Sequence, residues 1–383
     1  ERARGEAGGR SGMKFGVFLP NGSNGYIPSA AAPRYLPSWE HNLAITQEAE
    51  RQGLDFVLSM MKYRGFGGET GYWDACLETF TLMAGLAAAT TRIGLFPSVT
   101  LLAHHPALAA RMVATIDQMS GGRCGLNIVT GWNRPEYVQM GLWPGDSHYA
   151  RRYELAADYL AILKALWRDG RVTHRSEFYT LEDCTVTPHP GRELPIVCAG
   201  QSPAGIAFTA AHGDWNFVMA HPARLREIVD GVKAAAARHG RQVGTYALFG
   251  MILAGTDAEA RAEGERIIAG ADRGAIANIL ASAALDSNTG GTADRLKEAL
   301  ALPMEEGNIA FMSFPVLAGS PETVARRIDA IAAETGIDGM LFSWPDFVAG
   351  IRMFGEQVRP RLACLAPAGS GQPKPGHDAQ RAH

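Results

Sequence analysis

An apolar stretch of this chain contains a carboxamide side chain, Asn127. The segment Cys124–Val129 is short and contains β-branched residues, which predicts a buried strand, and Gly121 and Gly122 end the helical pattern before it. A buried amide without partners costs about 1–3 kcal/mol, so Asn127 must bond either the backbone or a ligand. Thr130–Trp132 opens a loop at the carboxyl end of this strand, where parallel α/β proteins bind ligands. Asn127 is therefore a candidate site residue.

Two segments carry groups suited to binding an anion. Ala199–Pro203 follows an expected strand and opens an expected helix, so its free backbone N–H groups could bind a phosphate. The alternative is an ordinary helix start, with Ser202 as the N-cap and Pro203 at the first helical position. Arg151, Arg152 and Tyr153 begin a long helical pattern and offer guanidinium groups and a hydroxyl to a phosphate, although a solvated arginine pair is equally expected.

Other chemistry-bearing residues stand where expected strands end. Met61 and Lys62 follow the second expected strand and could lie against a flat ring, or could be a core methionine and a surface lysine. Ser98 ends the third, where its hydroxyl could enter the site or cap the backbone. His104 and His105 resemble a metal pair, but adjacent loop residues do not converge on one ion. We therefore expect no metal site.

Strand-like and helix-like patterns alternate along the chain, which predicts a parallel sheet. Eight short runs are expected strands: Lys14–Pro20, Asp55–Met60, Ile93–Val99, Cys124–Val129, Pro195–Ala199, Trp215–Met219, Tyr246–Leu253 and Gly339–Trp344. This number favours an α/β fold of the TIM-type (β/α)8 barrel kind with insertions. The alternative is an open doubly wound sheet, but no G-x-G-x-x-G follows the first run. The polar stretch Asp286–Ile309 predicts an insertion, either a mobile lid or an interface segment.

The composition is that of an ordinary globular protein, with 383 residues, 46% hydrophobic, 20% charged and a net charge of −3. This balance predicts no nucleic-acid partner, and no apolar run approaches the roughly 18 residues of a membrane span. The five cysteines show no C-x-x-C spacing, which favours reduced core thiols in a cytoplasmic protein. We expect residues 1–12 and 366–383 to be a disordered extension and a disordered tail, and residues 13–365 to form one barrel domain.

Several ordered segments resemble the flavin-dependent luciferase-like monooxygenases. They are DQMSGGRCGLNIVTGW (117–132), RRYELAADYLAILKALW (151–167) and VCAGQSPAG (197–205). Within that superfamily, MMKYRGFGG (60–68) and WPGDSHYARRY (143–153) are similar to the pyrimidine monooxygenases of the bacterial Rut uracil-degradation pathway. The resemblance runs almost without gaps from residue 13 to about residue 217 and is looser from there to residue 364.

This resemblance implies a bacterial-luciferase-like barrel that uses O2 and reduced FMN, with NAD(P)H acting through a separate flavin reductase. It implies FMN contacts at Met61, Lys62, Asn127, Glu136, Arg152, Tyr153 and Ser202. Asn127 and Ser98 would be catalytic, and Arg152, Tyr153 and Ser202 would hold the phosphate. The implied reaction opens a uracil-like small heterocycle through a flavin N5-peroxide, and the protein would be a homo-oligomer.

The resemblance has departures that leave an alternative open. Ser98 stands where the pyrimidine monooxygenases have threonine, and the loops PNGSNGYIPS and LLAHHPAL differ from their pattern. Riboflavin lyase, which uses reduced FMN and O2 to oxidise the ribityl chain of riboflavin and release lumichrome, is the alternative. A non-catalytic flavin-binding protein is disfavoured, because Asn127 and the Ser98 hydroxyl are both present.

Overall fold

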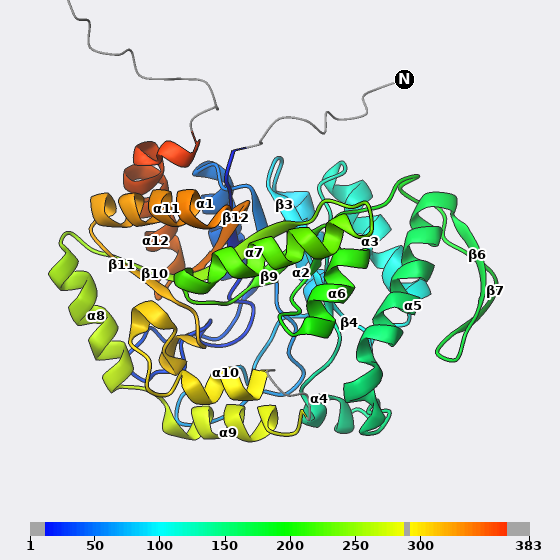
Figure 1. The fold of residues 1–383 in the computed structure, drawn as a ribbon, viewed down its shortest axis with the longest axis horizontal. Helices are drawn as coiled ribbons and strands as arrows, with labels where there is room; N and C mark the ends of the chain where they lie inside the picture. Colours follow the sequence, from blue (N-terminus) through cyan, green and yellow to red (C-terminus); the bar gives the residue numbers. More distant parts are fainter. Residues whose placement is uncertain (1–11, 287–291, 366–383) are drawn as a thin grey trace, which may run out of the picture.

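Parallel strands surrounded by helices form the body of the protein, which we describe from a computed structural model (Figure 1). The structure describes residues 12–286 and 292–365, so the expectations for residues 1–11 and 366–383 and for the middle of the insertion lie outside it. The strands of the main sheet are β1 (Lys14–Phe18), β2 (Phe56–Leu58), β3 (Gly94–Phe96), β4 (Ser98–Thr100), β5 (Leu126–Val129), β8 (Ile196–Cys198), β9 (Trp215–Val218), β10 (Gly244–Leu253), β11 (Val316–Gly319) and β12 (Gly339–Ser343).

The main sheet curls into a nearly closed barrel. Its order is β3-β2-β1-β12-β10-β9-β8-β5-β4, and every pairing along this path is parallel. The two ends of the path, β3 and β4, are separated in the chain only by Pro97, and a parallel bridge joins Leu95 to Cys124. The prediction of a TIM-type barrel is therefore confirmed, and the open doubly wound sheet is wrong.

Helices surround the barrel or cover the loops at one end of it. They are α1 (Trp39–Arg51), α2 (Thr79–Ala89), α3 (Pro106–Ser120), α4 (Arg134–Val138), α5 (Ser147–Asp169), α6 (Pro203–His212), α7 (Pro222–Ala237), α8 (Asp257–Ala269), α9 (Arg273–Ala283), α10 (Thr292–Glu298), α11 (Pro321–Thr335) and α12 (Phe347–Met353). An antiparallel hairpin, β6 (Arg171–Arg175) and β7 (Thr180–Thr185), extends from the end of α5. No helix within the described ranges has the length and apolar character needed to cross a membrane.

Two details of the barrel differ from the expected strands. The third expected strand, Ile93–Val99, is two strands, because Pro97 has no N–H to give to the sheet. β11 (Val316–Gly319) also pairs with β10, and it was not among the expected strands.

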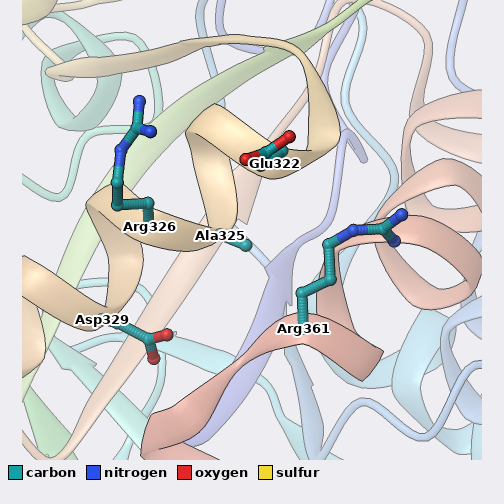
Figure 2. A pocket seen from close by; sticks show the side chains of 5 residues that line it. All are labelled: Glu322, Ala325, Arg326, Asp329 and Arg361. Atoms are coloured by element: carbon teal, nitrogen blue, oxygen red, sulfur yellow. The ribbon is translucent and has the colours of Figure 1, made fainter.

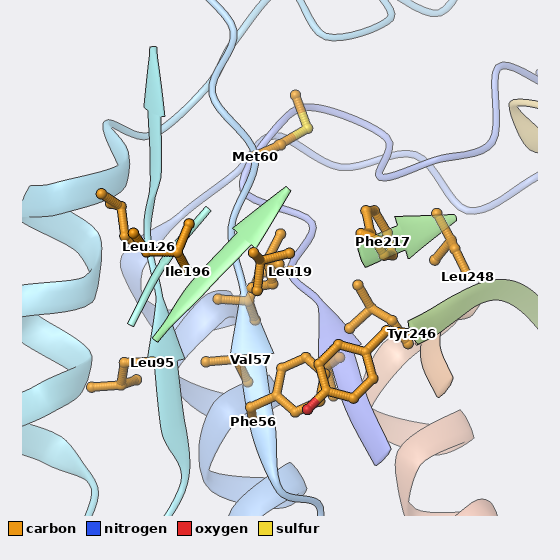
Figure 3. Close-up of a cluster of buried hydrophobic side chains, with 14 of the residues drawn as sticks. Leu19, Phe56, Val57, Met60, Leu95, Leu126, Ile196, Phe217, Tyr246 and Leu248 are labelled. Atoms are coloured by element: carbon orange, nitrogen blue, oxygen red, sulfur yellow. The ribbon is translucent and has the colours of Figure 1, made fainter. Parts of the chain in front are cut away.

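Large side chains fill the barrel interior (Figure 3). The rings of Phe56 and Tyr246 stack with centroids 4.9 Å apart, and Trp215 stacks on the other face of Tyr246 at 4.4 Å. Because β1 and β12 lie between β2 and β10 in the sheet, the contact of Phe56 with Tyr246 crosses the interior. Offset aromatic stacking of this kind adds about 0.5–1.5 kcal/mol per pair to area burial. The barrel is thus a packed core, and ligand-binding groups must lie at its carboxyl end.

α9 and the insertion that follows it pack on loops at the carboxyl end of the barrel. A separate apolar cluster joins Ala275, Ile276, Ile279, Ala283, Leu296, Ala299 and Ile309 to the loop residues Phe66 and Tyr72. α9 and α10 pack against each other and are drawn with α4 along the lower edge of Figure 1. α9 and the described part of the insertion that packs with it therefore cover the loops at this end of the barrel.

Candidate active site

Ser98 and Asn127 form a direct pair across two neighbouring strands. Their Cα atoms are register partners in β4 and β5, and Asn127 Nδ2 donates to Ser98 Oγ at 2.7 Å. Both side chains are buried, with residue exposures of 1% for Ser98 and 5% for Asn127. The expected third strand and fourth strand thus bring these two candidates together.

The hydrogen bonds around Ser98 determine how Asn127 is oriented. Ser98 Oγ donates to the carbonyl of Ser59, which can only accept, so it must accept from an N–H of Asn127. Asn127 Oδ1 therefore points away from Ser98, and it has no hydrogen-bond partner within the described ranges. Ser59 Oγ and the backbone N of Ser98 both bond Thr79 Oγ1, which holds this group in place. Asn127 Oδ1 is therefore a buried, unused acceptor, and such an atom calls for a ligand donor or a water.

Lys62 and Glu136 form a buried ion pair through Lys62 Nζ and Glu136 Oε1. The same carboxylate accepts from Asn133 Nδ2 at 2.6 Å and from the backbone N of Tyr63 at 3.1 Å. Burial lowers the pKa of Lys62, and the charge of Glu136 opposes that effect. Because the carboxylate has three donors, the pair is satisfied, as a buried charge requires.

Aromatic rings surround the ammonium of Lys62. Its Nζ lies 4.3 Å from the ring centroid of Phe66, 5.2 Å from that of Trp132 and 5.6 Å from that of Trp73. Cation–π contacts at these distances stabilise a desolvated cation by about 1–2 kcal/mol. The preceding residue, Met61, is half-buried. Lys62 is thus a buried charged residue and not the surface lysine that the sequence alone also allowed.

Arg152 is the second buried cation among the candidates. Its Nη1 donates to Asp286 Oδ2 at 2.8 Å, with side-chain exposures of 9% and 2%. Arg152 Nε is buried and has no hydrogen-bond partner in the described part of the chain. The neighbouring Arg151 behaves differently, because it bonds Glu154 and Glu177 at the surface. Of the two arginines, Arg152 is therefore the one buried in the structure.

Tyr153 and Ser202 both lie close to the start of α6. Ser202 Oγ accepts from the backbone N of Gly205 at 3.2 Å, and Pro203 occupies the first turn, so the N-cap role is present. Gly200 and Gly205 approach so closely that a Cβ on Gly205 would lie 2.6 Å from Gly200 Cα and 2.7 Å from Tyr153 Oη. The two glycines thus let the tyrosine hydroxyl reach the helix N-terminus, where backbone N–H groups favour an anion.

The side chains of His104 and His105 bond groups within four residues of them in the chain. His105 Nδ1 caps α3 by accepting from the backbone N of Ala107, and His104 Nδ1 lies 3.2 Å from Thr100 Oγ1. Thr100 Oγ1 is also bonded to Tyr63 Oη at 2.8 Å. Within the described ranges, no group of three or more His, Cys, Asp or Glu side chains is arranged to hold a metal ion.

Two supporting residues were missed from the sequence. Asn133 directly precedes α4 and stands three positions before Glu136 in that helix, a spacing that could have suggested a contact. Asp286 was expected only as the start of the insertion, and it lies 134 positions from Arg152, so no local pattern could have revealed the pair.

A hollow on the outer surface lies apart from these residues (Figure 2). It is lined by Glu322, Ala325, Arg326, Asp329 and Arg361, which belong to α11 and the turn Arg359–Arg361. Asp329 accepts there from the backbone N of Ala363 and of Cys364, both at 2.9 Å. This carboxylate therefore anchors the last described residues of the chain, and the hollow contains none of the candidate residues.

The fold and the site together define a class of protein, a TIM-type barrel with its buried polar groups at the carboxyl ends of the strands. The sequence profile of the family described as luciferase-like monooxygenase matches residues 13–339. The chain belongs to the luciferase-like monooxygenase family.

Two relatives with closely similar sequences are named for the same activity. The pyrimidine monooxygenase RutA of Cronobacter turicensis is 46% identical over 356 residues, covering 92% of this chain and 93% of that protein. RutA of Escherichia coli O6:K15:H31 is 44% identical over 358 residues, covering 92% and 97%. The solved structure of riboflavin lyase (RcaE), with modified FMN and riboflavin, has a TM-score of 0.76 at 23% identity, covering 91% of both chains. That structural similarity supports the fold alone.

Proposed function

We propose that this protein is a monooxygenase that uses reduced FMN and O2 to oxidise a pyrimidine-type ring. The observation that carries the proposal is the 46% identity to a pyrimidine monooxygenase over 92% of the chain. Reduced FMN would come from a separate NAD(P)H-dependent flavin reductase. Riboflavin lyase has only 23% identity, which favours the pyrimidine substrate over riboflavin.

The residues present fit FMN in three respects. Asn127 Oδ1 is a buried acceptor without a partner in the described ranges, and it suits an N–H of a flavin or pyrimidine ring. Arg152 Nε is a buried donor without a partner there, and it suits a phosphate oxygen. Tyr153 Oη and the N-terminus of α6, which Ser202 caps, offer further donors to an anion.

Each group has a distinct role in this proposal. Reduced flavin, when bound, supplies the electrons that activate O2 for transfer of one oxygen atom. Ser98 holds Asn127 so that its Oδ1 orients the ring that it bonds. Lys62, fixed by Glu136, keeps a positive charge in the buried site and stabilises negative charge that develops on the substrate. The rings of Phe66, Trp73 and Trp132 exclude water around that charge.

The proposal also includes homo-oligomeric assembly, a cytoplasmic location and a single barrel domain over residues 13–365. Light scattering of the purified chain would test the assembly. These parts are independent of the site chemistry.

One experiment tests the substrate directly. The protein is incubated in air with FMN, NADH and a flavin reductase, and uracil or riboflavin is added in separate reactions. We expect uracil to be consumed only when all components are present, with no lumichrome formed from riboflavin. Lumichrome release without uracil turnover would overturn the proposal in favour of riboflavin lyase. A reaction without this protein controls for oxidation by free reduced flavin.

A further inference from the structure

Arg152, which the proposed function gives the role of binding the FMN phosphate, already has an anionic partner in the protein, the carboxylate of Asp286. Arg152 Nη1 donates to Asp286 Oδ2 at 2.8 Å, and the side chains are 9% and 2% exposed. Its Nε remains buried without a partner in the described part of the chain. The anion at this guanidinium is therefore a carboxylate of the protein itself, and one donor is still available.

Asp286 follows a helix, α9, that packs against loop residues near the site. It follows α9 (Arg273–Ala283) by three residues. Asp272, the N-cap of α9, accepts from Thr70 N at 2.7 Å and from Thr70 Oγ1 at 2.8 Å. The apolar face of the same helix packs on Phe66 and Tyr72. These contacts at the start and along the face of α9 place the carboxylate beside Arg152.

We propose that Asp286 competes with the phosphate of the bound cofactor for Arg152 and so limits the affinity for the cofactor. This inference rests on the proposed function, in which Arg152 binds the FMN phosphate. Two anions at one buried guanidinium repel each other, because little water screens them and they share one positive charge. FMN must displace Asp286 or bind against its repulsion, whereas riboflavin has no phosphate and does not meet this cost.

A limited affinity suits a cofactor that arrives from a separate reductase and leaves again. An arginine without a competing carboxylate would hold the phosphate more tightly and slow that exchange. Asp286 is thus an affinity-setting residue that acts through Arg152, and it is not a catalytic residue.

The test uses Asp286→Asn, which keeps the shape of the side chain and removes its charge. Dissociation constants for FMN and for riboflavin are measured by quenching of flavin fluorescence. We expect FMN to bind about tenfold more tightly or better, as loss of a charged competitor predicts, and riboflavin to bind as in the wild type. Inorganic phosphate should also compete with FMN more strongly in the variant.

Glu177→Gln is the matched control. Glu177 pairs with Arg151, the neighbour of Arg152, at 2.6 Å on the protein surface. This variant removes the same charge from an adjacent arginine, and we expect its FMN affinity to be unchanged. A gain of affinity in both variants would show a general effect of net charge and would overturn the inference.

FMN affinity that is unchanged or weaker in Asp286→Asn would also overturn it, because Asp286 would then orient Arg152 without competing. If the Asn variant does not fold, Asp286→Ser is measured in its place. Arg152→Met separates the two proposals. Equal FMN affinity in Arg152→Met and wild type would refute the phosphate role of Arg152, whatever the Asp286 variants do.

Discussion

Asn127 Nδ2 donates to Ser98 Oγ at 2.7 Å between adjacent strands, and this bond leaves Asn127 Oδ1 as a buried acceptor without a partner in the described ranges. A native protein rarely buries an acceptor in this way unless a ligand or water uses it. The register of β4 and β5, which brings Ser98 and Asn127 together, therefore determines which atom of Asn127 is left for a ligand.

Asn127→Ala removes this acceptor and should lower turnover by about 10²-fold, the loss typical of one oriented polar group in an active site. FMN binding should remain, because the residues proposed to hold the FMN phosphate are unchanged. Steady-state turnover and flavin fluorescence measure the two effects separately. Ser98→Thr is the control, since it keeps the hydroxyl that orients Asn127. Normal turnover in Asn127→Ala would contradict the role given to Asn127.

Lys62→Met should lower the free energy of unfolding by about 3 kcal/mol or more, because it leaves the carboxylate of Glu136 buried without its cation. The double variant Lys62→Met with Glu136→Gln should lose less than the sum of the two single variants. Urea unfolding measures all three. Arg168→Met should change stability little, since Arg168 and its partner Asp169 are 55% and 51% exposed. Additive single effects would show that the pair is not coupled.

Gly205→Ala should destabilise the protein and weaken FMN binding, although alanine normally favours a helix. The new Cβ would lie 2.7 Å from Tyr153 Oη and 2.6 Å from Gly200 Cα. The control is Gly231→Ala in α7, where a Cβ meets nothing within 4 Å. That variant should gain about 0.5–1 kcal/mol. The melting temperatures of both variants are measured with and without FMN. Equal melting temperatures, and an equal shift on adding FMN, would contradict the prediction.

Glu50 should make stability depend on pH in the acid range. Burial alone would raise its pKa, but hydrogen bonds from the backbone N–H groups of Ile93, Arg92 and Thr91 outweigh burial and lower the pKa to about 2. The folded state therefore gains stability above the ordinary glutamate pKa of 4.5 and loses it as pH falls from about 4.5 towards 2.

Glu50→Gln should lower the free energy of unfolding by about 1–2 kcal/mol at pH 7, and the difference from wild type should shrink near pH 2.5. Urea unfolding at both pH values measures it. Glu227→Gln, on the exposed face of α7, makes the same charge change and serves as the control. A difference that does not depend on pH would contradict the role of the Glu50 charge.

The sequence by itself determined the barrel and most of the residues of the candidate site. The alternation of apolar runs with helical patterns indicates parallel βα units, because strands buried on both faces must be apolar throughout. An amide inside such a run, as at Asn127, needs a partner wherever the strand lies. Local spacing also predicts the N-cap role of Ser202, since capping depends only on the next three residues.

Only the tertiary structure decided which groups meet. The partner of Asn127 depends on the register of β4 and β5, and that of Lys62 is 74 positions away. Arg152 meets Asp286 across 134 positions, through a helix whose placement depends on packing against Phe66 and Tyr72. Local propensity acts over a few residues, whereas these contacts depend on how the closed barrel and the insertion pack together. The sequence therefore predicted that Asn127 needs a partner and that Arg152 could bind an anion, and the packing of distant segments determined the partner that each one has.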